Sequence, residues 1–165
     1  MTMQAPQCFL QVRVADQRLE VKENGVVVVS YPVSTAKNGV GELNGSGCTP
    51  RGWHRVRAKI GGDAPLNAVF VGRRATGEVY SDAWAAQFPE RDWILTRILW
   101  LDGLEPGLNR YGKVNSASRY IYIHGSPDSG VTGQPQSHGC IRMTSADVLD
   151  LFDRVAAGTR VLIDG

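Results

Sequence analysis

Residues 136–142 read QSHGCIR, and residues 144–158 continue as TSADVLDLFDRVAAG, the one firm helix pattern in the chain. The first stretch places a histidine, a glycine and a cysteine in a row, with an arginine two positions after the cysteine. Such a cysteine can serve as a nucleophile, bind a metal ion, or fill a small space in a hydrophobic core. The rest of the sequence has to decide between these roles.

The helix pattern shows where Cys140 stands in the fold. Thr144 or Ser145 can cap the helix at its N-terminus, and Gly158 can end it. Its apolar positions fall on one face of a helix and are Val148, Leu149, Leu151, Phe152 and Val155. We therefore expect one α-helix that packs against a sheet and begins shortly after the cysteine.

The remainder of the chain has the pattern of short strands. Nineteen glycines and eight prolines favour many turns, and apolar residues alternate with polar ones over much of the N-terminal half. Asn24-Gly25 predicts a hairpin turn, since both residues tolerate positive φ. The predicted strands are residues 8–14, 17–23, 26–32, 52–61, 67–73, 93–105, 119–125 and 159–163. Together they predict a single mainly-β domain over residues 1–165, a sandwich or barrel-like sheet with one helix against it.

Two segments fall outside this pattern. Residues 34–50 are glycine-rich and polar, which predicts a long loop of the kind that is functional or mobile. Residues 75–93 are irregular and predict a short strand with a surface excursion, which is a candidate lid.

Composition and the N-terminal pattern limit the classes of binding partner and the cellular compartment that we expect. The 18 Lys and Arg are balanced by 16 Asp and Glu, so nucleic acid is not an expected partner. The N-terminus lacks the pattern of a secretory signal, and no segment is long and apolar enough to span a membrane. Three cysteines, an odd number, fit free thiols in a reducing compartment, although one disulfide and one working thiol is the alternative. We therefore expect a cytoplasmic protein, or a periplasmic or cell-wall one if a signal has been removed.

A nucleophilic role for Cys140 needs an activated thiol and a base. A thiol beside a histidine and just before a helix is expected to have a lowered pKa. Gly139 would let its own N–H and that of Cys140 point at a developing oxyanion. His138 lies only two positions away in a loop, where neighbours rarely face each other. His124 ends a predicted strand sixteen residues earlier, and we therefore favour it as the general base.

Two other roles for Cys140 have to be weighed. Buried structural cysteines are common, but the adjacent histidine argues against that role here. His124, His138 and Cys140, with His54, are of the right type to bind zinc. Because the close ligand spacing of structural zinc sites is absent, we expect no metal and no other cofactor. His54, beside Trp53, is expected to be an ordinary surface or strand residue.

The pair His124-Gly125 and the block SHGCIR at residues 137–142 resemble the signature of the L,D-transpeptidase (YkuD-type) family. In that family a histidine precedes an S/T-H-G-C-x-R/N block by a loop similar to the one between Gly125 and Ser137. Thr49-Pro50-Arg51-Gly52 resembles the family's T-P-x-G element, which precedes a strand. The N-terminal strand and hairpin pattern also fits, so the resemblance spans nearly the whole chain.

The resemblance implies a YkuD-like β-sandwich in which the cysteine lies in a cleft and acts on peptidoglycan stem peptides. The thiolate attacks the carbonyl at the L-centre of meso-diaminopimelate in a tetrapeptide stem, D-Ala leaves, and a thioester forms. Water then completes an L,D-carboxypeptidase reaction, whereas an amine makes a 3→3 cross-link or a lipoprotein attachment. Carbapenem-type β-lactams are implied as covalent inhibitors.

The resemblance also assigns roles to individual residues of this chain. Cys140 is the nucleophile and His124 the base and later the acid, oriented by the carbonyl of Gly125. Ser137, His138 and Gly139 shape the cysteine loop and its oxyanion site. Arg142 is expected to bind a substrate carboxylate, since a guanidinium binds one bidentately.

Three hypotheses follow. The first is a cytosolic L,D-carboxypeptidase in muropeptide recycling, because no export signal is visible. The second is the catalytic domain of an exported L,D-transpeptidase. The third is a non-catalytic peptidoglycan-binding module with an inert Cys140, which would react slowly with alkylating agents at neutral pH.

Overall fold

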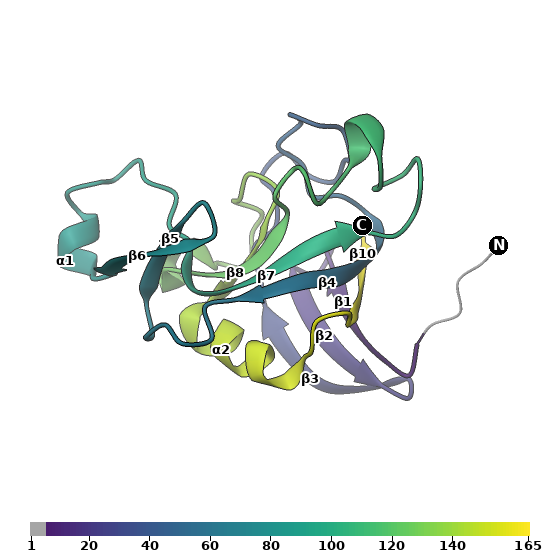
Figure 1. The fold of residues 1–165 in the computed structure, drawn as a ribbon, viewed down its shortest axis with the longest axis horizontal. Helices are drawn as coiled ribbons and strands as arrows, with labels where there is room; N and C mark the ends of the chain where they lie inside the picture. The colour runs from purple at the N-terminus through teal and green to yellow at the C-terminus, as the bar shows by residue number, and fades with distance from the viewer. Residues whose placement is uncertain (1–5) are drawn as a thin grey trace.

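The computed structural model describes residues 6–165, which form ten strands and one long helix (Figure 1). The strands are β1 (Cys8–Arg13), β2 (Arg18–Glu23), β3 (Val26–Pro32), β4 (Gly52–Ile60), β5 (Ala68–Val71), β6 (Arg74–Val79), β7 (Leu95–Gly103), β8 (Tyr122–Ser126), β9 (Ile141–Thr144) and β10 (Arg160–Asp164). The helices are α1 (Asp82–Ala85) and α2 (Ser145–Arg154), with 3-10 turns η1 (Gly112–Val114) and η2 (Asp128–Gly130). This confirms the predicted mainly-β fold with one main helix.

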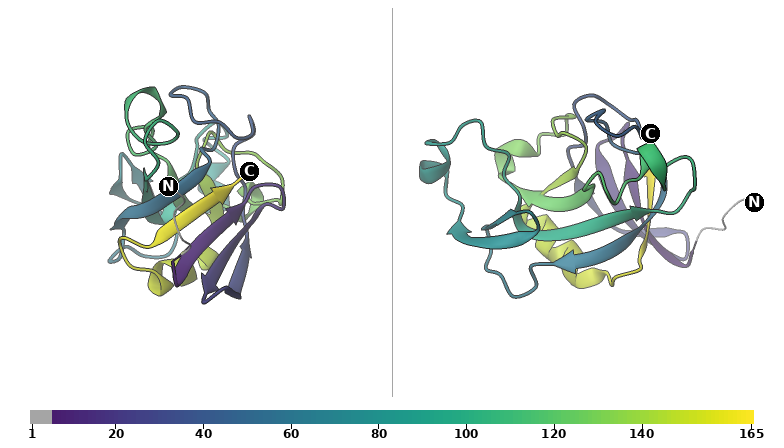
Figure 2. Two further views of the ribbon diagram at one scale, coloured as in Figure 1. Left: turned by 90° about the vertical axis from the view of Figure 1, so that its right-hand side faces the viewer. Right: turned by 45° about the horizontal axis from the view of Figure 1, so that its top comes forward.

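The strands form one curled sheet in the order β3-β2-β1-β10-β4-β7-β5-β6, with β8 paired to β7 and β9 to β8. The strands from both ends of the chain meet at its centre, where β1 and β10 run parallel (Figure 2). Most other pairs are antiparallel, and β8 with β9 is the second parallel pair. The curl brings β1–β3 across from β7–β9 and gives the two layers expected of a sandwich.

The hairpin between β2 and β3 has the predicted turn. Asn24 and Gly25 have φ values of 51° and 80°, the pair of positive values that a type I′ turn requires. The residues before it alternate as predicted, with Leu19 and Val21 fully or almost fully buried.

Helix α2 begins as predicted and ends earlier than predicted. The Thr144 side chain caps it by accepting the Asp147 N–H at 3.2 Å. The helix ends at Arg154, because Val155 adopts an extended conformation and is buried in the core. The prediction that Gly158 ends the helix is therefore wrong; its φ of 92° serves the turn into β10.

The two faces of the sheet around β8 and β9 pack in two different hydrophobic clusters. One set of side chains faces α2 and the layer β1–β3 in the main core, and includes Ile123, Ile141 and Met143. The other face carries a smaller cluster in which Tyr122 and Ile98 pack with Cys140 at the edge. Alternation along the strands therefore separates core residues from the face that carries the cysteine.

Strand β8 is displaced from its predicted range. It begins at Tyr122 and continues to Ser126, because Tyr120 has a φ of 57° and belongs to the preceding turn. Residues 75–93 contain the end of β6 and the short helix α1, as the expected short strand and surface excursion. Within residues 6–165, no helix is both long and apolar enough to cross a membrane.

Candidate active site

The parallel pair β8–β9 brings His124 and Cys140 to one face of the sheet. Ile123 is in register with Ile141, and His124 with Arg142. Cys140, just before β9, therefore lies beside Tyr122, one diagonal step from His124 on the same face. The Cys140 sulfur accepts the Tyr122 N–H at 3.4 Å, which agrees with this register.

The backbone of Gly125 holds the His124 ring. His124 Nδ1 lies 2.6 Å from the Gly125 carbonyl oxygen, so Nδ1 carries the proton and donates it. Nε2 is then the unprotonated nitrogen, which is the atom that a general base needs. The side chain is buried, and burial lowers the pKa of His124 below its usual value, although the Gly125 carbonyl opposes this. The imidazole is therefore neutral at neutral pH.

The Cys140 thiol is also held in its neutral form. Its S–H donates to the Tyr120 carbonyl at 3.3 Å, and burial raises the pKa of Cys140 to about 11. The prediction of a lowered pKa is wrong for two structural reasons. Strand β9 separates the cysteine from the start of α2, so the helix N-terminus lies too far away to stabilise a thiolate. His138, the adjacent histidine, points elsewhere.

His138 is a surface residue that faces Asp92. Its side chain is 80% exposed, and its Nδ1 lies 3.7 Å from Asp92 Oδ2. Asp92 also accepts a 3.0 Å hydrogen bond from Arg142 Nη2, and the Arg142 side chain is only 13% exposed. The three residues line a cavity of about 300 Å³, with Trp93 and Gln136 among its other walls. Arg142 is thus positioned at a cavity on the His124 face, as a carboxylate-binding residue requires.

Ser137 and Gly139 shape the cysteine loop. The Ser137 hydroxyl donates to the Cys140 carbonyl at 2.5 Å and accepts the Gly139 N–H at 3.2 Å. Gly139 has a φ of 132°, and a Cβ there would lie 3.2 Å from the Cys48 carbonyl oxygen. Only glycine fits this position without strain. Because its N–H is bonded to Ser137, Gly139 does not offer it to an oxyanion here, contrary to our expectation.

The predicted loop 34–50 forms hydrogen bonds with the residues on both sides of Cys140. Ser34 exchanges backbone hydrogen bonds with Arg142, and Lys37 N–H donates to the Ser137 carbonyl at 2.9 Å. The Thr49 hydroxyl donates to the Gly139 carbonyl at 3.0 Å and accepts the Ala36 N–H at 3.0 Å. Thr49 belongs to the T-P-x-G-like element, and this bond shows how that element is linked to the cysteine loop.

Arg119, from the turn before β8, is hydrogen-bonded to the loop 34–50. Its guanidinium donates to the carbonyls of Cys48 and Glu42, at 2.7 Å and 3.2 Å. Burial lowers the pKa of Arg119, and the nearby Cys48, Glu42 and Cys140 oppose this. Its charge also favours a thiolate on Cys140, because it lowers the pKa of that thiol.

The remaining residues of the alternative zinc set are separated. His54 is buried on β4, where its ring nitrogens contact the Gly52 carbonyl and the Ser116 hydroxyl at 3.1 Å and 2.9 Å. It is a strand residue but not a surface one. In the described part of the chain, no three His, Cys, Asp or Glu side chains are grouped to hold a metal ion. All three cysteines are free thiols.

Sequence reasoning did not select Asp92, Arg119 or the backbone of Tyr120 and Tyr122. Asp92 comes from the irregular segment 75–93, and Arg119 comes from a turn. The two tyrosines contact Cys140 through main-chain atoms. None belongs to a motif with a recognisable spacing. Thr49 differs from these residues because it belongs to the Thr49-Pro50-Arg51-Gly52 motif. The motif did not predict its hydrogen bond to the Gly139 carbonyl.

The geometry suits an acyl transfer in which the proton moves during the attack. A neutral thiol and a neutral imidazole lie on one face, with Nε2 of the imidazole free of the proton. Rotation about the Cβ–Sγ bond would release the S–H from the Tyr120 carbonyl. A neutral base that took this proton would form the thiolate at the moment of attack on a carbonyl.

The chain is similar to known proteins in sequence pattern and in fold. A family model described as the L,D-transpeptidase catalytic domain (YkuD) matches residues 9–163. One similar fold is that of an L,D-transpeptidase from Mycobacterium smegmatis, which is 18% identical with a TM-score of 0.56. The match covers 96% of this chain and 59% of that one. Another is residues 123–326 of the L,D-transpeptidase from Xylanimonas cellulosilytica, 21% identical with a TM-score of 0.56, covering 98% of this chain and 62% of that one.

A third similar structure is L,D-transpeptidase 3 from Mycobacterium tuberculosis in complex with a faropenem-derived adduct. It is 15% identical with a TM-score of 0.57, and the match covers 97% of this chain and 61% of that one. The chain thus spans about three fifths of the length of these solved relatives. No curated protein matches the chain significantly. Because the family model covers nearly all of the sequence, the chain belongs to the L,D-transpeptidase (YkuD) catalytic domain family.

Proposed function

We propose that the protein removes D-Ala from peptidoglycan tetrapeptide stems, as an L,D-carboxypeptidase that works through a thioester on Cys140. The observation that supports this most directly is the placement of His124 and Cys140 on one sheet face, with the His124 tautomer set by Gly125. Membership of the family supports the substrate class, and the placement of the two side chains supports Cys140 as the nucleophile and His124 as the base.

In the first half of the reaction, Cys140 Sγ attacks the carbonyl at the L-centre of meso-diaminopimelate. Nε2 of His124 takes the thiol proton as the carbon–sulfur bond forms. When the tetrahedral intermediate collapses, the carbon–nitrogen bond breaks and His124 gives this proton to the departing amine of D-Ala. The products of this step are free D-Ala and a thioester between the tripeptide and Cys140.

In the second half, water attacks the thioester while His124 takes its proton. The carbon–sulfur bond breaks, the proton passes to the sulfur, and the tripeptide leaves with a new carboxyl group. Arg142 binds a substrate carboxylate during both halves, beside or in place of its single bond to Asp92. We place water as the acceptor because it needs no binding site of its own.

β-Lactams should acylate the same thiol. A solved relative holds a faropenem-derived adduct, and that chemistry needs only a nucleophile and a base in an open cleft. We propose that a carbapenem forms a covalent adduct on Cys140 of this protein. Intact-protein mass spectrometry would detect it, with Cys140→Ala as the unreactive control.

One assay tests the proposed reaction and its acceptor. The protein is incubated with a disaccharide-tetrapeptide and an amine acceptor, and the products are weighed by mass spectrometry. Tripeptide and free D-Ala alone support hydrolysis. A 3→3 dimer would instead assign the protein as a transpeptidase. If Cys140→Ala released D-Ala as fast as the parent, the proposed mechanism would be wrong.

A further inference from the structure

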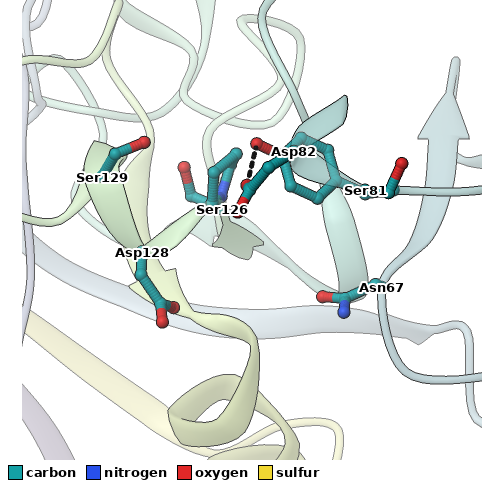
Figure 3. A pocket seen from close by; sticks show the side chains of 8 residues that line it. Asn67, Ser81, Asp82, Ser126, Asp128 and Ser129 are labelled. Atoms are coloured by element: carbon teal, nitrogen blue, oxygen red, sulfur yellow. Dashed lines mark hydrogen bonds between the residues drawn. The ribbon is translucent and has the colours of Figure 1, made fainter. Parts of the chain in front are cut away.

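The β5–β6 hairpin carries an arginine at its tip. At the base of the hairpin the Tyr80 N–H donates to the Asn67 carbonyl at 2.9 Å, and both residues line a cavity of about 340 Å³ (Figure 3). At the tip, Gly72 and Arg73 have φ values of 56° and 65°, the pair of positive values that a type I′ turn requires. The base is therefore fixed beside β8, and the turn presents the Arg73 side chain at the far end.

Arg73 contacts the side chains of Tyr120 and Tyr122 at the same time. Its Nη1 donates to the Tyr122 hydroxyl at 3.0 Å, and its guanidinium carbon lies 4.7 Å from the centre of the Tyr120 ring. The same carbon lies 4.9 Å from the centre of the Trp100 ring. A planar guanidinium can stack on aromatic faces and donate hydrogen bonds from its edge. One side chain thus joins the hairpin tip to both tyrosines.

The main-chain atoms of these two tyrosines hold the Cys140 thiol. The Tyr120 carbonyl accepts the S–H at 3.3 Å, and the Tyr122 N–H donates to the sulfur at 3.4 Å. The charged side chains that act on this thiol are Asp92, Arg142 and Arg119. Arg73 is not one of them, so an effect of Arg73 on the thiol has to pass through the two tyrosines.

Tyr120 is the weaker of the two supports. Its φ is 57°, a left-handed conformation in which a bulky side chain is strained, and the residue is 52% exposed. Tyr122 is 5% exposed and lies in β8, so sheet pairing holds its main chain. A strained residue keeps its conformation only where its surroundings fix it. The stacked guanidinium of Arg73 is such a contact for Tyr120.

We propose that Arg73 is a positioning residue, which holds Tyr120 in its left-handed conformation so that the Tyr120 carbonyl keeps the Cys140 thiol in one orientation. The proposal rests on the proposed function only in that Cys140 is the nucleophile there. Without the Arg73 contact, Tyr120 would relax to a negative φ and its carbonyl would turn away from the sulfur. The neutral thiol would lose the acceptor that stabilises it, and the sulfur would be less well directed at a substrate carbonyl.

Alkylation by iodoacetamide reports on the thiol without any substrate. It is followed at the Cys140 peptide by mass spectrometry, over a range of pH. We expect Arg73→Gln to react about twofold to fivefold faster than the parent at pH 7, as for the loss of one weak hydrogen bond to the neutral thiol. Its pH–rate profile should shift to lower pH, because a thiol without its acceptor has a lower pKa.

Arg74→Gln is the matched control for the lost charge. Arg74 is the exposed neighbour of Arg73, and its side chain makes no hydrogen bond or cation–π contact within residues 6–165. This variant should react as the parent does. No increase in Arg73→Gln, or an equal increase in Arg74→Gln, would overturn the proposal.

The Tyr120→Gly background separates positioning from a general loosening of the fold. Glycine adopts a φ of 57° without strain, so the carbonyl at position 120 needs no stacked side chain to keep its place. Arg73→Gln added to Tyr120→Gly should therefore leave the alkylation rate at that of Tyr120→Gly alone. A merely structural role of Arg73 would give the same increase in both backgrounds, and that result would contradict the proposal.

D-Ala release is measured on the same variants. We expect Arg73→Gln to lower kcat severalfold with KM little changed, because Arg73 acts on the thiol and not on the substrate. Faster alkylation of Arg73→Gln, together with no D-Ala release by the parent, would refute the proposed reaction alone. D-Ala release by the parent, together with unchanged alkylation of Arg73→Gln, would refute the positioning role alone.

Discussion

His124 Nδ1 donates to the carbonyl of Gly125, the residue that follows it, across 2.6 Å. A neighbouring main-chain carbonyl here has the role that a carboxylate has in many catalytic triads, since it fixes the tautomer and the ring orientation. Gly125 faces the core, where a Cβ would lie 2.3 Å from the Leu95 carbonyl oxygen. The backbone at Gly125 therefore packs closely against β7, which leaves no room for a side chain at the residue that holds the His124 ring.

Replacement of the base should remove most of the activity and little of the stability. We expect His124→Gln to slow D-Ala release by about a hundredfold to ten-thousandfold, the usual contribution of general acid–base catalysis. The initial rate of D-Ala release measures this. His138→Gln is the control, because His138 points to Asp92, and it should stay within a few-fold of the parent. Equal losses in both variants would contradict the assignment of the base.

Asp92 would compete with the substrate for Arg142. Its carboxylate accepts a 3.0 Å hydrogen bond from Nη2 of the guanidinium that we propose binds a substrate carboxylate. Asp92 is about half exposed, so the ion pair contributes about 1 kcal/mol at most. We therefore expect Asp92→Asn to lower KM for the tetrapeptide by up to about fivefold, with kcat little changed. Arg142→Gln should raise KM, and a raised KM in Asp92→Asn would show that Asp92 helps to bind substrate.

Alkylation of Cys140, the proposed nucleophile, should be slow. Because burial raises the pKa of its thiol to about 11, little thiolate exists at neutral pH. We expect its reaction with iodoacetamide at pH 7 to be roughly tenfold to a hundredfold slower than that of a free thiol of pKa about 8.5. Peptide mass spectrometry over time gives the rate. A rate equal to or above that of a free thiol would show that the folded protein stabilises the thiolate.

From the sequence we expected slow alkylation of Cys140 only in a non-catalytic binding module. Because the folded protein raises the pKa of this thiol, slow alkylation does not distinguish such a module from an enzyme. The sequence could place a histidine and a helix near the cysteine, and both are signs of a low pKa. It could not show that β9 lies between Cys140 and α2, or that the nearer histidine turns away. These facts depend on tertiary packing, which the local pattern does not contain.

Other features were predictable because they are local. The Asn24-Gly25 turn, the Thr144 cap and the alternation of β2 follow from the conformational preferences of a few adjacent residues. The pairing of β8 with β9 joins distant segments, and the sequence pattern did not predict β9 as a strand. Asp92 and Arg119 had no such motif, and only the folded chain shows their contacts.

The hydroxyl of Thr49 should matter to both stability and activity. It bridges the Ala36 N–H and the Gly139 carbonyl in a buried position beside the cysteine loop. Thr49→Val keeps the shape and removes both hydrogen bonds, so we expect a loss of about 1–3 kcal/mol in the free energy of unfolding and a lower kcat. Thr49→Ser keeps the hydroxyl and should retain most of both. A Val variant with parental stability and kcat would show that the bridge is dispensable.

The buried His54 should make the protein sensitive to mild acid. Burial lowers the pKa of His54 to about 4, whereas the unfolded chain has the ordinary value of 6.5. Between these values the unfolded state binds more protons, so stability is present above pH 6.5 and falls as the pH drops toward 4. The difference corresponds to about 3 kcal/mol at the acid end. Urea unfolding at several pH values measures it.

His54→Gln should flatten this dependence, because glutamine does not titrate and can still reach the Ser116 hydroxyl that contacts His54 Nε2 at 2.9 Å. The buried His124, whose pKa is also lowered, adds acid sensitivity of the same sign and remains in the variant. The slope should therefore become smaller rather than vanish. If His54→Gln lost stability between pH 6.5 and 4 as steeply as the parent, His54 would not be the buried neutral group that this structure shows.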